Sequence, residues 1–114
     1  SIPPSVTLIR ESLFLNCISL KEISIPSSVK EIEKNAFSNC TSLKTITIPS
    51  SVMSIGSYAF NKCTSLKSII VLSSPCAIRN LAFNKCTSLK NISIPFIIDP
   101  YSIGVNHETK ISLI

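Results

Sequence analysis

The chain has 114 residues, a formal net charge of +5 and 45% hydrophobic residues, but only 15% charged residues. This length fits one domain, and the composition excludes an intrinsically disordered chain because enough apolar surface is present to form a core. The longest apolar runs, residues 69–72 and 96–98, are far shorter than the ~20 residues of a membrane helix, so we expect no transmembrane segment. The chain opens at Ser1 without a basic and apolar leader, which fits a processed product or an excised segment.

A unit of 23 residues recurs along the chain. A cysteine, the phenylalanine three residues before it and the leucine three residues after it all keep this step. The cysteines are Cys17, Cys40, Cys63 and Cys86, the phenylalanines are Phe14, Phe37, Phe60 and Phe83, and the leucines are Leu20, Leu43, Leu66 and Leu89. Each unit carries too many apolar side chains to face water and too few to enclose a core, so we expect successive units to stack.

The repeats divide the chain into a solenoid over residues 1–98 and a C-terminal segment. Four repeats cover residues 2–24, 25–47, 48–70 and 71–93. Residues 99–114 abandon the pattern, with Asn106 where the phenylalanine belongs, and are expected to form a degenerate repeat or a cap. The alternation of Ile111 and Leu113 predicts one closing strand in this segment.

Within a repeat, three elements follow one another. A Leu-x-x-Leu-x-Leu segment such as Leu43–Ile48 predicts a β-strand, which ends at the next proline because proline lacks an N–H. The Ser-Ser-Val-x-x-Ile segment then favours a second short extended stretch over a helix, because it is rich in β-branched residues. The Ala-Phe-x-x-Cys segment predicts a tight turn before the next strand.

Four motifs recur with the repeat over residues 1–95. They are the proline after the strand (Pro3, Pro26, Pro49 and Pro95), the Val-x-x-Ile step, the Ala-Phe pair and the Cys-Thr-Ser-Leu turn. In these motifs the chain resembles the BspA-like, Treponema pallidum-type, leucine-rich repeat family. The resemblance implies a right-handed solenoid coil with parallel β-strands on the concave face, short extended or turn segments on the convex face and little α-helix. It also implies adhesion or protein binding at a cell surface or outside the cell.

Outward side chains of successive strands form columns across the predicted sheet, because side chains alternate along a strand. The first column consists of lysines, and the next two are mostly hydroxyl-bearing with one apolar interruption at Ile70. We take nine of these residues as candidate partner-binding residues: Lys44, Thr45, Thr47, Lys67, Ser68, Ile70, Lys90, Asn91 and Ser93.

Two interpretations of these columns stay open. Between Lys44 and Ile98 the chain has six basic residues and no Asp or Glu, which indicates a positive stripe that attracts an anionic glycan, an acidic protein or an anionic surface. Copying of a Leu-Lys dipeptide with the repeat also produces such a column, which then serves only solubility. Ile70 is likewise either an anchor for a partner or an ordinary exposed apolar residue.

The periodic cysteines are expected to be buried free thiols. Their spacing is not the short paired spacing of a zinc site, and parallel stacked side chains present their Cβ atoms poorly for a disulfide. Cys76 lies outside the column and is expected to be the accessible thiol. An odd number of unpaired cysteines fits a reducing compartment such as the cytoplasm, whereas the family resemblance favours the cell surface, so both localisations stay open.

The sequence contains almost none of the residue combinations that catalysis requires. The single histidine, His107, has only Glu108 beside it, and the two glycines are too few for a phosphate-binding loop. We therefore expect no enzyme, no cofactor and no metal site. Nucleic acid is not an expected partner either, because no aromatic residue occupies an outward strand position. Sequons at Asn39 and Asn91 matter only in a secreted protein.

The sequence thus favours a non-enzymatic interaction module that binds a protein or an anionic glycan through the concave face. The alternatives are a structural, self-assembling element and an intracellular scaffold for protein–protein interactions. The chain enters the first repeat in phase, which leaves an N-terminal edge with Ile2, Val6, Ile9 and Phe14 beneath it. We predict a homodimer through this edge, because an unguarded strand edge is a template for pairing.

Overall fold

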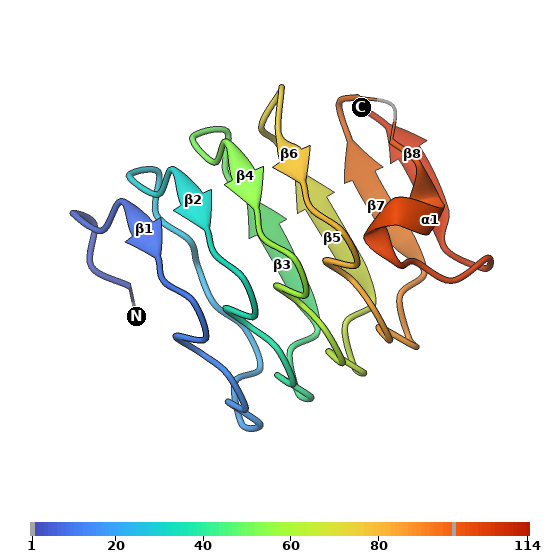
Figure 1. The fold of residues 1–114 in the computed structure, drawn as a ribbon, viewed down its shortest axis with the longest axis horizontal. Coiled ribbons are helices and arrows are strands. Elements are labelled where there is room, and N and C mark those ends of the chain that lie inside the picture. Colours follow the sequence, from blue (N-terminus) through green and yellow to red (C-terminus); the bar gives the residue numbers. More distant parts are fainter. Residues whose placement is uncertain (1, 97) are drawn as a thin grey trace.

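The computed structural model describes residues 2–96 and 98–114, which wind into a coil (Figure 1). The strands of the coil form two four-stranded parallel sheets. Sheet A contains β1 (Leu8–Ile9), β2 (Glu31–Ile32), β4 (Ser54–Ile55) and β6 (Ala77–Ile78) in that order, and sheet B contains β3 (Thr45–Ile48), β5 (Ser68–Val71), β7 (Asn91–Ile94) and β8 (Lys110–Leu113). The predicted solenoid with parallel strands, short extended segments and little helix is confirmed.

Sheet B begins one repeat later than the sequence suggests. The first repeat has its own Leu-x-x-Ile-x-Ile segment over residues 20–25, yet the structure has no strand there. Among the described residues, one backbone hydrogen bond joins this segment to the next turn, from Lys44 N to Lys21 O at 3.2 Å.

The four phenylalanines form a continuous stack inside the coil. Ring centroids of Phe14 and Phe37 lie 5.0 Å apart, those of Phe37 and Phe60 lie 5.1 Å apart, and those of Phe60 and Phe83 lie 5.5 Å apart. The last three of these rings are fully buried, whereas Phe14 is half-buried. Inward residues of both sheets, such as Ile32 and Ile46, complete the core.

The predicted turn around each phenylalanine is confirmed, and it has an unexpected backbone. Two residues in every turn have a positive φ near +60°, four residues apart, and none of them is glycine. They are Ser12 and Asn16, Asn35 and Asn39, Tyr58 and Lys62, and Leu81 and Lys85. This conformation brings the backbone N–H of Phe37 within 2.7 Å of the carbonyl oxygen of Ala59, and the other turns repeat the contact. Successive turns therefore bond to each other in the turns as well as in the sheets.

Side-chain thiols and amides also tie each turn to the one before it. Cys40 Sγ donates to the carbonyl oxygen of Phe14 at 3.2 Å, and Cys63 and Cys86 donate to Phe37 and Phe60 in the same way. Asn39 Nδ2 donates to Asn16 Oδ1 at 2.8 Å, and Asn84 Nδ2 donates to Asn61 Oδ1 at 3.1 Å. All of these hydrogen bonds run from a later turn to an earlier one.

Neighbouring backbones come especially close at Gly56, which follows β4. A Cβ atom on Gly56 would lie 2.5 Å from the backbone nitrogen of Lys34 and 2.6 Å from the carbonyl carbon of Glu33. The Gly56 N–H donates to the carbonyl oxygen of Ile32 at 2.7 Å. Glycine at this position therefore allows an approach that any side chain would obstruct.

The C-terminal segment forms a further, shorter turn. Its helix α1 (Pro100–Ile103) begins after the N-cap residue Asp99 and ends at Gly104, which has a φ of +81°. Ile103 is fully buried, and its carbonyl oxygen accepts from Phe83 N as an alanine carbonyl does in the other turns. The predicted closing strand is confirmed as β8, which pairs with β7 in parallel. No helix in the described part of the chain has the length and apolar character needed to cross a bilayer.

Candidate functional site

The register of sheet B places the candidate residues of the strands in two rows on one face. Thr45, Ser68 and Asn91 are partners across β3, β5 and β7, and Lys110 of β8 extends this row. Thr47, Ile70 and Ser93 form the second row, which Ser112 extends. The residues between the rows, such as Ile46 and Ile69, are buried. The structure therefore brings together the six strand residues that the sequence singled out.

The three candidate lysines line up along the start of the strands. Backbone hydrogen bonds join Lys67 N to Lys44 O at 2.8 Å and Lys90 N to Lys67 O at 2.9 Å, and all three side chains are exposed. We call Lys44, Lys67 and Lys90 the lysine row. Lys110 N continues the ladder to Lys90 O at 2.8 Å, so β8 adds a fourth cation to this side. The sequence could have indicated Lys110, because Lys110-Ile-Ser-Leu repeats the pattern of Asn91-Ile-Ser-Ile.

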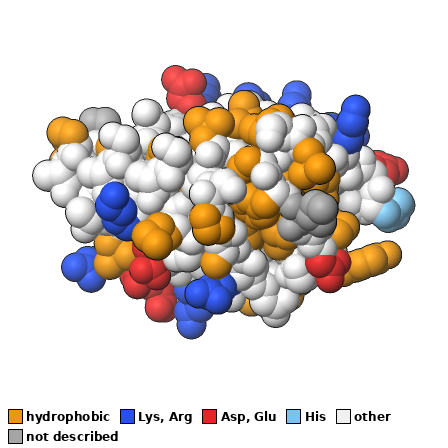
Figure 2. Space-filling model, turned by 90° about the horizontal axis from the view of Figure 1, so that it is seen from above, with side chains coloured by type: hydrophobic (Ala, Val, Ile, Leu, Met, Phe, Trp, Pro, Cys, Tyr) orange, Lys and Arg blue, Asp and Glu red, His pale blue; other side chains and the backbone are white. Residues whose placement is uncertain are grey.

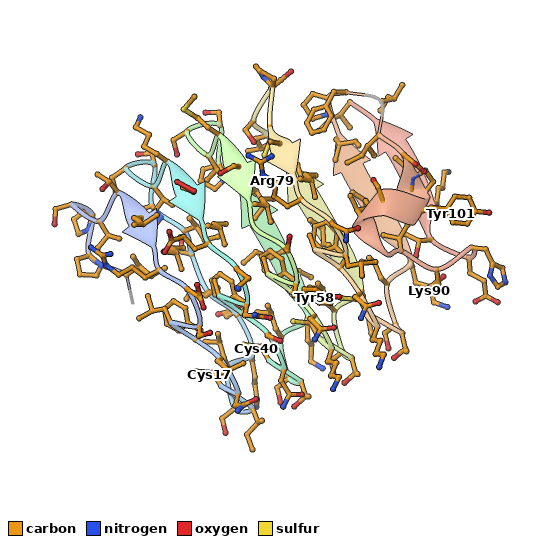
Figure 3. All side chains as sticks on the ribbon, viewed as in Figure 1. Cys17, Cys40, Tyr58, Arg79, Lys90 and Tyr101 are labelled. Atoms are coloured by element: carbon orange, nitrogen blue, oxygen red, sulfur yellow. The ribbon has the colours of Figure 1, made fainter. Side chains whose placement is uncertain are left out.

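The six basic residues after residue 43 do not form one stripe. Arg79 follows β6 of sheet A, whereas Lys90 precedes β7 of sheet B, and Figure 3 shows the two far apart. Lys62 and Lys85 lie in the turns, at the positive-φ positions. The expectation of a single stripe was wrong. It assumed that charges close in the sequence are also close in space, whereas the coil distributes each repeat over two sheets and a turn.

Two apolar side chains stand out on the sheet B side, one on β5 and one just after it. Ile70 is 40% exposed between the register partners Thr47 and Ser93, and Leu72 is 50% exposed two residues further on. Leu72 occupies the place that proline holds in the other repeats. Figure 2, a view from above, shows hydrophobic side chains gathered toward the middle of that face, with basic side chains along both of its long edges.

A groove of about 720 Å³ runs along the outer edge of β3. It lies where the first repeat fails to supply a strand, so the repeat pattern, which predicts a strand there, gave no sign of the groove. The walls are mostly apolar and also carry Glu22. The lining residues are Phe14, Leu20, Glu22, Ile23, Ser24, Ile25, Thr45, Ile46, Thr47, Pro49 and Leu72.

Two thiols of the cysteine column, those of Cys40 and Cys63, have raised pKa values. Burial, with the neighbouring Cys63 as a second cause, raises the pKa of the Cys40 thiol to about 12. The pKa of Cys63 is also raised, by the hydrogen bond with Cys86 and by burial. All five cysteines are free, and no cluster of three His, Cys, Asp or Glu side chains occurs within residues 2–96 and 98–114.

Cys76 does not have the accessible thiol that the sequence suggested. Its side chain is only 7% exposed, and burial raises its pKa. The half-buried thiol belongs to Cys17 instead, in the first turn (Figure 3). The Cys17 thiol is more exposed than the later ones because its turn lies at the end of the stack, and the repeat pattern does not predict this difference.

A coil of short repeats with a parallel sheet, stacked phenylalanines and tight turns defines a leucine-rich repeat solenoid. The model of the BspA-type leucine-rich repeat region matches residues 1–106 in six copies. The chain belongs to this family, as the motifs in the sequence indicated. Proteins of the family are repeat-based interaction modules and are generally non-enzymatic.

Two solved structures are similar to this chain. A leucine-rich repeat protein from Bacteroides ovatus is 35% identical over 95% of this chain, with a TM-score of 0.85. A leucine-rich repeat protein from T. pallidum is 35% identical over 81% of this chain, with a TM-score of 0.73. The chain spans 28% of the first protein and 43% of the second. A comparison with curated proteins finds no match.

Proposed function

We propose that this chain is a non-enzymatic adhesion module at a cell surface, which binds a protein or an anionic glycan through the exposed face of sheet B. The register of sheet B carries this proposal, because it places Thr45, Ser68 and Asn91 in one row and Thr47, Ile70 and Ser93 in another. Such an array of polar side chains, together with the lysine row, offers hydrogen bonds and positive charge over a continuous surface.

The lysine row and the hydroxyl rows have separate tasks in this proposal. The lysines attract an acidic partner and accelerate its encounter with the face, an effect that salt screens. The hydroxyl and amide groups then fix the partner's position through hydrogen bonds. Ile70 supplies an apolar contact among these polar groups, as anchor residues in interfaces do.

An array of matrix proteins and sulfated or sialylated glycans tests the proposal. The wild-type chain is expected to bind a ligand, and the Lys44→Gln/Lys67→Gln/Lys90→Gln variant is expected to lose most of that binding. A Lys30→Gln/Lys34→Gln/Arg79→Gln variant removes three charges from other exposed positions and serves as the matched control. Equal binding by both variants, or no ligand for the wild type, would overturn the proposal.

Self-association is a second candidate, and the first turn favours it. Leu13, Leu15 and Ile18 are 53%, 43% and 59% exposed, whereas the next repeat carries Ala36, Ser38 and Thr41 at these positions. Such an apolar patch fits a homodimer contact in the region where the sequence predicted one. Light scattering over a concentration series is expected to show dimers that a Leu15→Ser/Ile18→Thr variant abolishes. A wild-type chain that stays monomeric at high micromolar concentration would contradict this candidate.

A further inference from the structure

On the sheet B side, two exposed apolar side chains lie at the C-terminal end of β5, and lysines lie just before β3 and β5. Ile70 and Leu72 point outward two residues apart, and Leu72 also lines the groove beside β3. Lys44 and Lys67 lie at the opposite end of the same strands. Leu72 lies five positions after Lys67, which is a distance of about 16 Å along an extended chain. A ligand that lies along β3 and β5 therefore meets positive charge at one end and aliphatic surface at the other.

The groove also offers unpaired backbone. β3 pairs with β5 on one side, and on the other side the described residues make a single backbone hydrogen bond, at Lys44, which directly precedes β3. The edge of a strand with free N–H and C=O groups is a template for a further extended chain. The groove runs beside this edge, and its walls are formed by Ile23, Ile25 and Leu72 among others. These features favour an occupant with a peptide backbone and apolar side chains.

We propose that the groove beside β3 takes an extended segment of a partner protein, whose apolar side chain packs against Leu72 and Ile70 while acidic side chains meet Lys44 and Lys67. This inference rests on the proposed binding function of sheet B and narrows its ligand to an acidic, apolar protein segment. Glu22 in the groove wall repels a carboxylate at that point, so the acidic residues of the partner lie over the lysine row, outside the groove.

An anionic glycan suits only half of this surface. Sulfate or carboxylate groups would satisfy the lysine row, but a polar sugar chain would leave Ile70 and Leu72 without apolar contact. Burial of these two side chains releases water only when an apolar group covers them. Charge complementarity and the apolar groove together therefore favour a protein segment.

Selection from a random 12-residue peptide library displayed on phage tests the inference with the full chain as bait. Enriched peptides are expected to combine acidic residues with an aliphatic or aromatic residue. Affinities of the synthetic peptides, measured by fluorescence anisotropy, are expected to fall about tenfold or more in Ile70→Thr/Leu72→Ser, because anchor residues dominate such contacts. Threonine at residue 70 is the residue that the preceding repeat has at Thr47, so the change suits the fold.

Two matched controls test whether the location of the changed residues matters, and not only the loss of an apolar side chain or of charge. Met53→Ser removes an apolar side chain that is 68% exposed beside sheet A, and it is expected to leave the peptide affinity unchanged. Lys44→Gln/Lys67→Gln is expected to weaken binding and its salt dependence, whereas Lys62→Gln/Lys85→Gln removes the same charge from the turns with a smaller effect. Urea midpoints of all variants check that each remains folded.

The inference would be overturned by the absence of an enriched peptide, by enriched peptides without acidic residues, or by peptides that bind the Ile70→Thr/Leu72→Ser variant as tightly as the wild type. A heparin fragment that loses affinity in this variant would assign the groove to a glycan and overturn it as well. If an array ligand depends on the lysine row and ignores Ile70 and Leu72, the proposed function stands and only this inference fails.

Discussion

Lys62 and Lys85 have left-handed backbone conformations that lysine does not favour. The Cβ of an L-residue in this region lies too close to the following carbonyl oxygen, at a cost of roughly 1–2 kcal/mol, and asparagine tolerates the conformation better. The earlier repeats have Asn16 and Asn39 at this place, where their side chains bond to each other. The repeat pattern did not reveal these positions, because glycine, the usual marker, stands at none of the eight, and only Asn16, Asn35 and Asn39 gave a weaker signal.

Replacement of Lys62 by asparagine is expected to stabilise the fold. Asparagine tolerates the positive φ at residue 62 better than lysine does. Its side chain would also lie next to Asn39, whose amide already bonds to Asn16. We expect a gain of about 0.5–1 kcal/mol in the free energy of unfolding, measured by urea denaturation. Lys67→Asn removes the same charge at an exposed position without a positive φ, and an equal gain there would contradict this explanation.

Gly56 is the residue whose small size the packing requires. Gly56→Ala is expected to destabilise the fold by about 1–3 kcal/mol, because the added methyl group meets the backbone of Lys34. Arg79 occupies the same place one repeat later and is exposed, so Arg79→Ala is the matched control. Thermal unfolding of the two variants compares them, and equal melting temperatures would rule out the close contact at Gly56.

Among the elements, the phenylalanine stack joins more turns than any single strand pair. Phe60 lies between two ring neighbours and is fully buried. Phe60→Ala is expected to cost about 3–5 kcal/mol, because it leaves a cavity and removes both ring contacts. Phe14→Ala is expected to cost less, because this ring is half-buried and stacks on one neighbour. Urea midpoints measure both losses, and a Phe60→Ala midpoint no lower than that of a Ser50→Ala surface control would be incompatible with the stacked core.

The buried thiol column predicts a loss of stability at high pH. The pKa of Cys40 rises from 9.0 to about 12 on folding, so the folded state holds its proton more tightly than the unfolded state does. Above pH 9 the unfolded chain releases this proton first, and stability falls as the pH rises from 9 toward 12. The urea midpoint is expected to fall over this range more steeply for the wild type than for Cys40→Ala. Parallel pH profiles would exclude a contribution from this thiol.

How much of the structure can be predicted from the sequence differs from element to element. The 23-residue step determines which residues pair in sheets A and B, so the repeat alone was enough to place Thr47, Ile70 and Ser93 in one row. The step says nothing about whether a given copy forms its strand, because residues 20–25 keep the motif and lack the strand. The same limitation hides α1, since Ile103 enters the core from a turn with a different length. The groove follows from the missing strand and was therefore beyond sequence reasoning.

At the scale of the whole molecule, charge is sorted by side. The principal axes measure 36 × 29 × 19 Å, so a side of the coil is several screening lengths wide, given a Debye length of about 8 Å at physiological salt. The lysine row and Lys110 lie on the sheet B side, whereas the cations of the sheet A side, Lys30, Lys34 and Arg79, are accompanied by Glu31 and Glu33. A large anion is therefore expected to bind the coil preferentially on the sheet B side.

Retention on a heparin column measures this preference without a natural ligand. The wild-type chain is expected to elute at a higher salt concentration than the Lys44→Gln/Lys67→Gln/Lys90→Gln variant, and both are expected to elute early at physiological salt because exposed charges are screened. The control variant with changes at Lys30, Lys34 and Arg79 carries the same net charge. Coelution of the two variants would show that retention on heparin depends on net charge alone.

The hydrogen bonds from each thiol and amide to the preceding turn also bear on how such a chain lengthens over generations. An internal turn presents donors on one side and the matching acceptors on the other, as Cys63 does toward Phe37 and Phe60 toward Cys86. A tandem duplication of the DNA for one unit, for example residues 48–70, therefore adds a turn whose two sides already match their new neighbours. The reading frame and the hydrogen-bond pattern are both preserved, so a copying error that would ruin most domains yields a longer, intact coil.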